Sequence, residues 1–289
     1  MSIILEEIAL KNEHSFRSKI DVLPHIQVPW HYHPHFELQF IERSKGTRIV
    51  GDCIDTFTEG DMVFMGPNLP HVWKNDDSYY QKNPDLRAVA WVVHFRADVF
   101  GPDFFEVPEM SRIKRFLSSS GRGIRIEGST KYKMIQIWQK LNTANFTQRI
   151  IYLLEMLDTL AQSDDLEYLA SEDFARIFQK SSNQKLYQIY EFVSRNFQQK
   201  IDLEQVAHEA SMSKTAFCRF FKNQTGKTFS EFLNEMRINY ARKLLAEGKL
   251  SISQIAYECG FNSPSYFNRQ FKAHTGKAPK EQRTQVSKL

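Results

Sequence analysis

The C-terminal third of the chain contains one sequence unit twice. Residues 203–226 read LEQVAHEASMSKTAFCRFFKNQTG, and residues 252–276 read ISQIAYECGFNSPSYFNRQFKAHTG. The copies are offset by fifty residues from Ser213 onward and by forty-nine before it, so the second copy has one additional residue in its turn. A sequence repeat indicates a duplicated structural unit. Two copies are too few for a solenoid, so the fold of this region follows from what one copy forms.

Each copy is predicted to form a short helix, a tight turn and a longer helix. In the first copy apolar residues recur at helical spacing, Asp202 is placed to cap the first helix, and Ser213 to cap the second. In the second copy Asn262-Ser263 supply the turn and the cap, and Pro264 takes the first helical position, where its missing N–H costs nothing. The residues expected to be buried on the longer helices are Phe217, Phe220, Phe221, Phe267 and Phe271. The remaining polar face is free to enter the major groove, as in a helix-turn-helix.

This pattern resembles the DNA-binding domain of AraC-type (AraC/XylS) bacterial transcription regulators. The residues that carry the resemblance are Ile255-Ala256, Gly260-Phe261, Ser263, Tyr266-Phe267, Arg269, Phe271-Lys272, Gly276 and Pro279. The family usually has Tyr-Arg soon after that proline, whereas Glu281-Gln282-Arg283 keeps only the arginine. The resemblance implies a transcription regulator that binds double-stranded DNA as a homodimer. If it is an activator, it also contacts RNA polymerase.

The charge distribution favours a nucleic-acid partner independently. Residues 180–289 contain 18 Lys and Arg against 9 Asp and Glu, whereas the rest of the chain contains 20 against 25. A basic module joined to a mildly acidic one favours phosphate neutralisation with release of counterions. Net charge alone also fits a merely solubilising surface, so it is the repeat that turns this balance into a prediction of DNA binding.

The segment between the copies, roughly Phe229 to Glu247, is predicted to be a helix that sets their spacing. Its apolar residues form one stripe, and Gly248 ends it. About 18 residues at 1.5 Å each span about 27 Å. This length is close to the helical repeat of B-DNA, about 34 Å. Both reading helices are therefore expected to enter successive major grooves on one face of the DNA.

The exposed side chains of the reading helices are predicted to have different roles. Arg219 and Arg269 occupy the same position in the two copies. An arginine can pair bidentately with guanine, and Asn268 can pair with adenine, whereas lysines suit phosphates, which fix the register without reading sequence. The alternative for either arginine is a helix-end or phosphate contact. The predicted DNA-contacting residues are Lys214, Thr215, Cys218, Arg219, Lys222, Ser263, Ser265, Asn268, Arg269 and Lys272.

The N-terminal region has a different pattern, in which short extended runs alternate with Gly, Pro, Asn and Asp. Such a pattern is typical of a small all-β barrel or sandwich. The polar residues that stand out are His31, His33 and Glu37 in an HxHxxxE motif, then Gly60-Asp61, His71 and Asn75. Together they resemble the two motifs of the cupins, which are jelly-roll barrels. The usual leading glycine of the first motif is absent, and its closing glycine comes late, at Gly46.

A strand through residues 30–40 would place the histidines, Glu37 and Gln39 on one face and the aromatic residues on the other. Three interpretations of the polar face remain open. In metal-binding cupins the corresponding His, His and Glu join a later histidine, here His71, and such ligands suit Fe, Mn or Zn. Sensor barrels of the AraC family mostly bind small organic effectors without metal. In the third interpretation the aromatic face is the core and the histidines are solvated.

We expect the second interpretation, a barrel that senses a sugar or related polar metabolite through aromatic stacking and a few hydrogen bonds, without a cofactor. The predicted effector-binding residues are His31, His33, Glu37, His71, Trp73 and Trp91. The alternative function is a metal-dependent cupin enzyme, a dioxygenase or isomerase, fused to a DNA-binding module. No nucleophile or acid–base pair elsewhere in the sequence favours it, so the chain is not expected to be an enzyme.

Two apolar stripes, at 134–141 and 150–160, predict an antiparallel pair of helices on the barrel. In the family such helices commonly form the dimer contact, and the alternative is packing within the monomer only. The expected α+β multidomain fold comprises a cupin-like sensor barrel (1–108), a helical dimerisation segment (109–165), a polar linker (166–183), and an all-α DNA-binding domain with two helix-turn-helix units (184–289).

The remaining composition predicts a cytoplasmic protein without a membrane partner. The three cysteines, Cys53, Cys218 and Cys259, lie far apart, which disfavours a disulfide framework. The N-terminus lacks a signal-peptide pattern, and no run approaches the about 20 apolar residues that span a bilayer.

Overall fold

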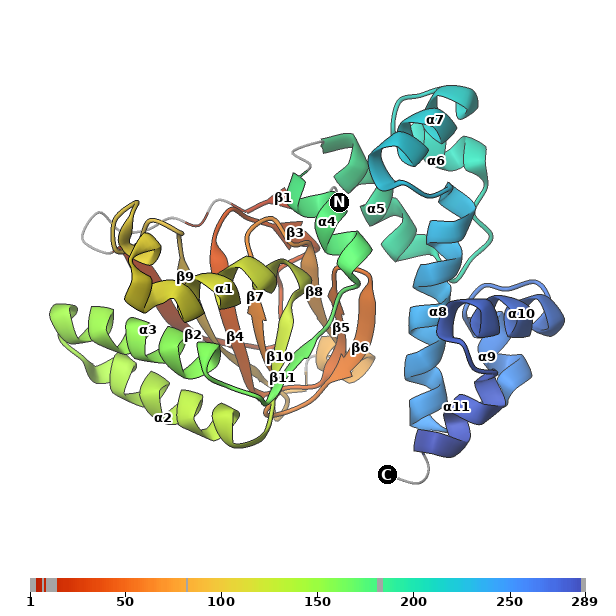
Figure 1. The fold of residues 1–289 in the computed structure, drawn as a ribbon. Coiled ribbons are helices and arrows are strands. Elements are labelled where there is room, and N and C mark those ends of the chain that lie inside the picture. The colour runs from red at the N-terminus through yellow and green to blue at the C-terminus, as the bar shows by residue number, and fades with distance from the viewer. Residues whose placement is uncertain (1–3, 7, 9–14, 82, 181–183, 287–289) are drawn as a thin grey trace. The chain divides into compact units, whose positions relative to one another are not determined.

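The computed structural model describes residues 4–6, 8, 15–81, 83–180 and 184–286. They form two compact units, one built from Ile4–Gly51 and Phe57–Gln179 and the other chiefly from Lys180–Leu289. The first unit contains helices α1–α4 and the strands of both sheets apart from the segment Asp52–Thr56. The second unit contains that segment and helices α5–α11 (Figure 1). The division separates the region of extended runs from the region of the repeat.

The strands form two sheets. The five-stranded sheet has the order β1-β3-β8-β5-β6, and the six-stranded sheet has the order β11-β10-β7-β4-β9-β2. The strands are β1 (Ile4–Leu5), β2 (Phe16–Leu23), β3 (His31–Tyr32), β4 (Phe36–Arg43), β5 (Gly46–Val50), β6 (Cys53–Phe57), β7 (Met62–Met65), β8 (His71–Asn75), β9 (Ala88–Phe95), β10 (Ile124–Ile126) and β11 (Leu166–Tyr168). The longest ladders join β9 to β2 and to β4, both antiparallel, so β9 lies between β4 and the edge strand β2.

Helices α1 (Ser111–Ser119), α2 (Gly128–Thr143) and α3 (Phe146–Ala161) pack on one face of the six-stranded sheet (Figure 1). The predicted helix pair is present as α2 and α3, which are separated by only two residues. The second of these, Asn145, caps α3 in a reciprocal arrangement with Gln148. Short 3₁₀ turns lie at Asp77–Tyr80, Phe104–Glu106, Pro108–Met110 and Ser120–Arg122. The apolar side chains of the helices and of β4, β7 and β9 form one core.

The predicted strand through residues 30–40 is broken in the structure. β3 belongs to the five-stranded sheet and β4 to the six-stranded sheet, with residues 33–35 turning between them. Both faces of β4 are buried: Leu38 and Phe40 join the core under the helices, while Glu37 and Gln39 face the other sheet. The interpretation with solvated histidines is therefore wrong, because His33 and His71 are each only 1% exposed.

The predicted linker, residues 166–183, contains regular structure. Its first residues form β11, which pairs antiparallel with β10, and Glu172–Lys180 form α4. Residues 181–183 of that segment lie outside the described residues. Among the described residues of this segment, the polar side chains of Glu167, Glu172, Asp173 and Arg176 are exposed on β11 and α4. β10 and β11 also carry the six-stranded sheet beyond residue 108, the predicted end of the barrel.

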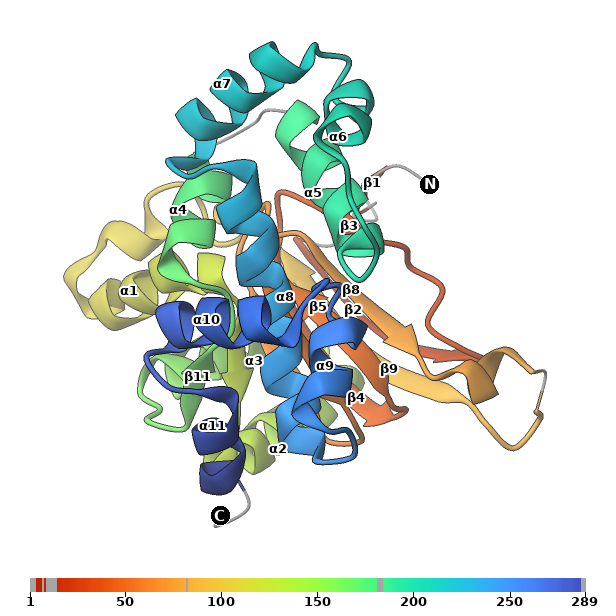
Figure 2. The ribbon, with the colours of Figure 1, turned by 90° about the vertical axis from the view of Figure 1, so that its right-hand side faces the viewer.

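In the second unit, residues 184–286 form helices joined by turns and loops, without strands (Figure 2). Its helices are α5 (Gln184–Asn196), α6 (Leu203–Glu209), α7 (Lys214–Thr225), α8 (Phe229–Glu247), α9 (Ile252–Glu258), α10 (Pro264–Thr275) and α11 (Pro279–Val286). The bounds of α8 agree with the prediction, and Gly248 follows it in the left-handed conformation, with φ of +69°. No helix in the described part of the chain is both long and apolar enough to cross a bilayer.

The two copies of the repeat agree in the way their helices begin and end. The side chains of Ser213 and Ser263 each accept a hydrogen bond from a backbone N–H in the first turn of the next helix, as predicted. At the other end Thr225 Oγ1 donates to the Phe221 carbonyl at 2.8 Å, and the equivalent Thr275 makes the same bond at the same distance. These local rules explain why the two copies fold alike.

Candidate functional site

The polar face of the two longer helices, α7 and α10, carries the predicted DNA-contacting residues. The exposed ones are Lys214, Thr215, Cys218, Arg219 and Lys222 on α7, and Ser265, Asn268, Arg269 and Lys272 on α10. Ser263 is half-buried, and its hydroxyl accepts the Tyr266 N–H at 3.4 Å, so this side chain caps α10. A cap residue is less free than its neighbours to contact DNA.

Buried phenylalanines fix which face of each helix is exposed. Phe217 and Phe221 of α7, and Phe267 and Phe271 of α10, are at most 1% exposed. Phe220 is only half-buried, because it lies one position away from Phe221 and so points toward the edge of the apolar face. The orientation of Arg219 and Arg269 toward solvent follows from this packing.

The two reading helices differ in how their cationic residues are held. Lys214 Nζ lies 2.8 Å from Glu204 Oε1, and this hydrogen bond raises the pKa of the Lys214 amine. Both partners are exposed, so the ion pair is weak, and a DNA phosphate can replace the carboxylate. On α10 the Arg269 guanidinium lies over the ring of Tyr266, a residue that the sequence analysis did not select for contact.

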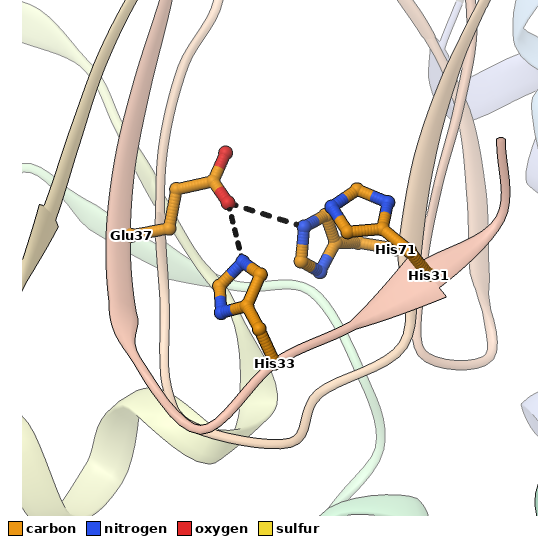
Figure 3. A group of neighbouring side chains, drawn as sticks. All are labelled: His31, His33, Glu37 and His71. Carbon is orange, nitrogen blue, oxygen red and sulfur yellow. Dashed lines mark hydrogen bonds and ion pairs between the residues drawn. The ribbon is translucent and has the colours of Figure 1, made fainter. Parts of the chain in front are cut away.

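The second candidate site lies between the two sheets of the first unit, where His31, His33, Glu37 and His71 meet (Figure 3). All four are buried, and their potential ligand atoms lie within 4.8 Å of one another. Glu37 Oε2 lies 2.8 Å from His33 Nε2 and 3.2 Å from His71 Nε2. The structure thus brings together the four polar residues that the sequence motifs predicted.

A fifth residue, His94 on β9, was missed by the sequence analysis. Its Nε2 lies 3.0 Å from Glu37 Oε2, because β9 pairs with β4 in a register that sets His94 directly opposite Glu37. Only the strand pairing reveals this contact. The period-two pattern of β9 was visible, but nothing in it indicated a partner fifty-seven residues away.

Backbone carbonyls fix which nitrogen of three histidines carries the proton. The Nδ1 atoms of His31, His33 and His71 lie 2.9, 3.1 and 2.7 Å from the carbonyl oxygens of Pro29, His35 and Leu69. A carbonyl oxygen only accepts, so each Nδ1 donates. In a neutral imidazole the Nε2 atom then offers a lone pair. The Nε2 atoms of His33 and His71 face the Glu37 carboxylate. Because lone pairs and a carboxylate repel one another, the cluster requires a positive charge between them, which an additional proton or a cation can supply.

The same cluster shifts the pKa values of its members. Burial raises the pKa of the Glu37 carboxyl, but the charges of His94 and His71 and the hydrogen bond with His33 outweigh it and hold that pKa well below its ordinary value. Burial lowers the pKa of His71 to about 4. The hydrogen bond with His31 lowers the pKa of the Glu6 carboxyl to about 2. The cluster therefore contains an ionised carboxylate and a neutral His71 at neutral pH.

Glu6, His31, Glu37 and His94 line a pocket between the sheets, whereas His33 and His71 do not. Its lining is Glu6, Lys19, Asp21, Leu23, Ile26, Val28, His31, Glu37, Gln39, Trp73, Ala88, Ala90, Val92 and His94. Trp73 is 3% exposed, and among the described residues its Nε1 donor has no hydrogen-bond partner. The Nδ1 atom of His94 likewise has none. One wall of the pocket is aliphatic and the other is polar.

Trp91 does not belong to this pocket, so its predicted role is wrong. On β9 alternate residues face opposite sides, and Ala90 and Val92 take the pocket side. The Trp91 ring instead meets Trp138 of α2, with the ring centres 5.9 Å apart. Its Nε1 atom donates to Glu42 Oε2 at 2.5 Å.

The donor set of the cluster fits a divalent transition metal. Histidines that bind metals usually donate their other ring nitrogen to a carbonyl or carboxylate, as His31, His33 and His71 do. Imidazoles with one carboxylate suit Fe, Mn or Zn. His71 Nε2, moreover, is a buried nitrogen that makes no hydrogen bond in spite of its closeness to Glu37.

Comparison with known proteins places the chain among DNA-binding regulators. Residues 206–285 match the family described as "Helix-turn-helix domain". Over 276 residues the chain is 24% identical to the HTH-type transcriptional activator RhaS of Yersinia pestis (strain Pestoides F), covering 91% of this chain and 92% of that protein.

Two solved structures also match. An AraC-type transcriptional regulator from Chromobacterium violaceum is 30% identical, over 35% of this chain and 91% of that one, with a TM-score of 0.34. ToxT from Vibrio cholerae strain SCE256 is 16% identical, over 97% of this chain and 99% of that one, with a TM-score of 0.36.

A basic helical unit with two exposed reading helices, matched to a helix-turn-helix family, defines a DNA-binding transcription regulator whose partner is double-stranded DNA. The duplicated motif and the relationship to RhaS along most of the chain narrow the class. The chain has an AraC-type helix-turn-helix domain and is similar to the activator RhaS along most of its length.

Proposed function

We propose that the chain is a ligand-responsive regulator in which both helix-turn-helix units, α6–α7 and α9–α10, read successive major grooves of one operator. The observation that carries the proposal is the duplication itself. Arg219 and Arg269 are exposed at equivalent positions of two helices, each of which begins at a serine cap and buries its phenylalanines. Each arginine contacts guanine, and Asn268 contacts adenine. The lysines Lys214, Lys222 and Lys272 contact phosphates.

The first unit is proposed to be a cupin-like sensor of a small polar metabolite such as a sugar. The two sheets with a pocket between them support this assignment. The pocket also presents one buried donor without a partner, Trp73 Nε1. A second buried atom without a partner among the described residues is His94 Nδ1, whose other ring nitrogen lies 3.0 Å from Glu37 Oε2. A ligand with hydroxyl groups satisfies both, because a hydroxyl donates and accepts.

The sensor proposal is tested by screening sugars and related polar metabolites for an increase in the thermal midpoint of the full-length protein. Trp73→Phe keeps a ring but removes the N–H, so it should weaken binding of an active compound. The matched control is Trp91→Phe, which changes the same atom on the opposite face of the sheet. Equal binding by all three proteins, or no active compound, would contradict the sensor role.

We further propose that the chain acts in the cytoplasm as a homodimer held by α2 and α3, and that it is an activator contacting RNA polymerase. RhaS, to which the chain is similar, is named as an activator. The dimer proposal rests on exposed apolar side chains of these helices: Tyr132, Phe146 and Ile151 are 69%, 65% and 56% exposed. In analytical ultracentrifugation the wild type should sediment as a dimer and Ile151→Asp as a monomer. A monomeric wild type would contradict the dimer proposal.

A second proposal concerns metal, because three carbonyl-oriented imidazoles converge near Glu37. His31, His33, Glu37 and His71 would hold a divalent transition metal, which would supply a Lewis acid for an oxygen atom of the effector. Elemental analysis of wild type and a His31→Ala/His33→Ala/His71→Ala variant tests it. Stoichiometric metal that the variant loses supports the site. Absence of metal from both leaves an organic-effector pocket, and turnover of a substrate would favour a cupin enzyme over a regulator without enzymatic activity.

A further inference from the structure

The second reading helix differs from the first by one aromatic ring. Tyr266 and Arg269 lie one turn apart on α10, and the central carbon of the Arg269 guanidinium lies 5.2 Å from the centre of the Tyr266 ring. Fifty residues earlier, Ala216 occupies the position of Tyr266 on α7. In the described part of the chain, no hydrogen bond, ion pair or ring contact holds Arg219. One reading arginine is therefore stacked and the other is free.

The ring of Tyr266 is itself held by the framework. Asn234 of α8 donates from Nδ2 to the Tyr266 hydroxyl oxygen at 3.1 Å, and the Phe261 ring lies behind it with the ring centres 6.0 Å apart. Tyr266 remains 39% exposed, so one part of the ring faces outward beside Arg269. Because α8 joins the two helix-turn-helix units, this contact ties the ring to the element that sets their spacing.

Stacking leaves the arginine competent to read a base. A guanidinium stacks through its flat face, whereas its five N–H donors point outward in its plane. A ring beneath Arg269 therefore restricts the side chain without using the donors that pair with guanine. A pre-ordered side chain loses less conformational entropy when it binds.

We propose that Tyr266 is a positioning residue for base recognition, which holds Arg269 in its reading conformation and makes the second helix-turn-helix unit the more selective of the two. The inference rests on the proposed base contact of Arg269. It assigns Tyr266 no contact with DNA, and it gives Asn234 the task of orienting the ring.

The test first requires a DNA duplex that the protein binds selectively. A library of random duplexes, long enough for two adjacent major grooves, is enriched on the full-length wild type, and the selected duplex is then substituted one base pair at a time. Dissociation constants are measured for wild type, Tyr266→Ala, Tyr266→Phe, Asn234→Ala, Arg269→Ala and the double variant Tyr266→Ala/Arg269→Ala. A duplex of unrelated sequence serves as the non-specific probe.

Arg269→Ala is expected to abolish the preference at one base pair. Tyr266→Ala should reduce the preference at that same base pair by about two- to five-fold, the range expected of an exposed cation–π contact. It should have no further effect when Arg269 is already alanine. Tyr266→Phe keeps the ring and should lose less than Tyr266→Ala, and Asn234→Ala should resemble Tyr266→Phe. Affinity for the unrelated duplex should stay unchanged in the Tyr266 and Asn234 single variants, which keep Arg269 and its charge.

Two failures are distinguishable. If Arg269→Ala keeps the full base preference, the proposed role of Arg269 in reading DNA is wrong. If Arg269→Ala loses the preference but Tyr266→Ala keeps it, only the positioning role is wrong. A uniform loss of affinity for every duplex, with a lowered thermal midpoint, would assign Tyr266 a structural role and would also overturn the proposal.

Discussion

The two helix-turn-helix units of this protein share a backbone design but differ at the turn and at the reading helix. Both turns contain the same hydrogen bond: Met212 N–H donates to the Ala207 carbonyl at 2.8 Å, and Phe261 N–H donates to the Ala256 carbonyl at 3.0 Å. The residue before each of these donors has a positive φ, +53° at Ser211 and +81° at Gly260. A common geometry has thus been retained with different residues.

The difference at the turn shows how surroundings decide which residue a backbone position needs. A Cβ atom at Gly260 would lie 2.6 Å from the Phe197 carbonyl oxygen and 2.8 Å from that of Gln198. Ser211, in contrast, is exposed. The second helix-turn-helix unit therefore requires glycine for two reasons, the left-handed backbone and the close approach of the turn that follows α5. At Ser211 the backbone alone favours glycine.

The largest expected effect comes from breaking the second turn. Gly260→Ser should destabilise the protein by about 2–4 kcal/mol, because it adds backbone strain to a steric clash. Thermal and chemical unfolding of the full-length protein measure this loss. Gly226→Ser is the control, since its φ of +76° is similar but nothing lies within 4 Å of its Cβ position. Equal losses in the two variants would mean that the contact with the Phe197 and Gln198 carbonyls is unimportant.

The next effect concerns the reading arginines. Arg219→Ala and Arg269→Ala should each remove about 1–3 kcal/mol of discrimination at one base pair, because each loses a bidentate contact. Binding to single-base variants of the selected duplex measures both. Lys222→Ala is the matched control, since a phosphate contact should weaken binding to all sequences uniformly. Loss of preference at the same base pair in both arginine variants would contradict two separate reading units.

A smaller effect should appear if the first helix-turn-helix unit is given an aromatic ring at the position that Tyr266 occupies in the second. Ala216→Tyr places an aromatic side chain one turn before Arg219, and about a two- to five-fold gain in preference at the Arg219 base pair is expected. The same panel of single-base variants measures it. Ala216→Leu controls for added apolar bulk. A gain from leucine equal to that from tyrosine would show that stacking is not the cause.

The smallest effect should come from making the first turn resemble the second. Ser211→Gly relieves a left-handed conformation in an exposed residue but adds freedom to the unfolded chain, so a net stabilisation of at most about 1 kcal/mol is expected. Denaturant unfolding resolves a change of this size when both proteins are measured together. Destabilisation by more than that amount would mean that the Ser211 side chain makes a contact that matters.

The sequence predicted the helical unit of the fold far better than the unit that contains the sheets. Helical spacing, capping residues and the repeat are local signals, so the bounds of α8 and the caps at Ser213 and Ser263 were predictable. The pocket depends on strand pairing over long separations. No local pattern indicates that His94 lies opposite Glu37. The side of β9 that faces the pocket also depends on the register of the strand, which the sequence does not reveal, and this explains the error at Trp91.

The same reasoning explains the parts of the N-terminal region that were mistaken. The two motifs located the four clustered residues, although His31 and Glu37 lie on different sheets instead of on one strand. The clustering of these side chains from different strands was thus predictable from the motifs, whereas the path of the backbone between them was not. Polar composition at 166–183 similarly concealed a strand, because exposed edges and loops use the same residues.

The central claim, that two duplicated helices read one operator, is tested most directly by methylation interference on the selected duplex. Methylation of guanine N7 blocks the contact expected of an arginine. The account predicts two clusters of interfering guanines about 10 base pairs apart on one face of the DNA. One cluster should disappear with Arg219→Ala and the other with Arg269→Ala. A single cluster, or two clusters that both survive these substitutions, would contradict it.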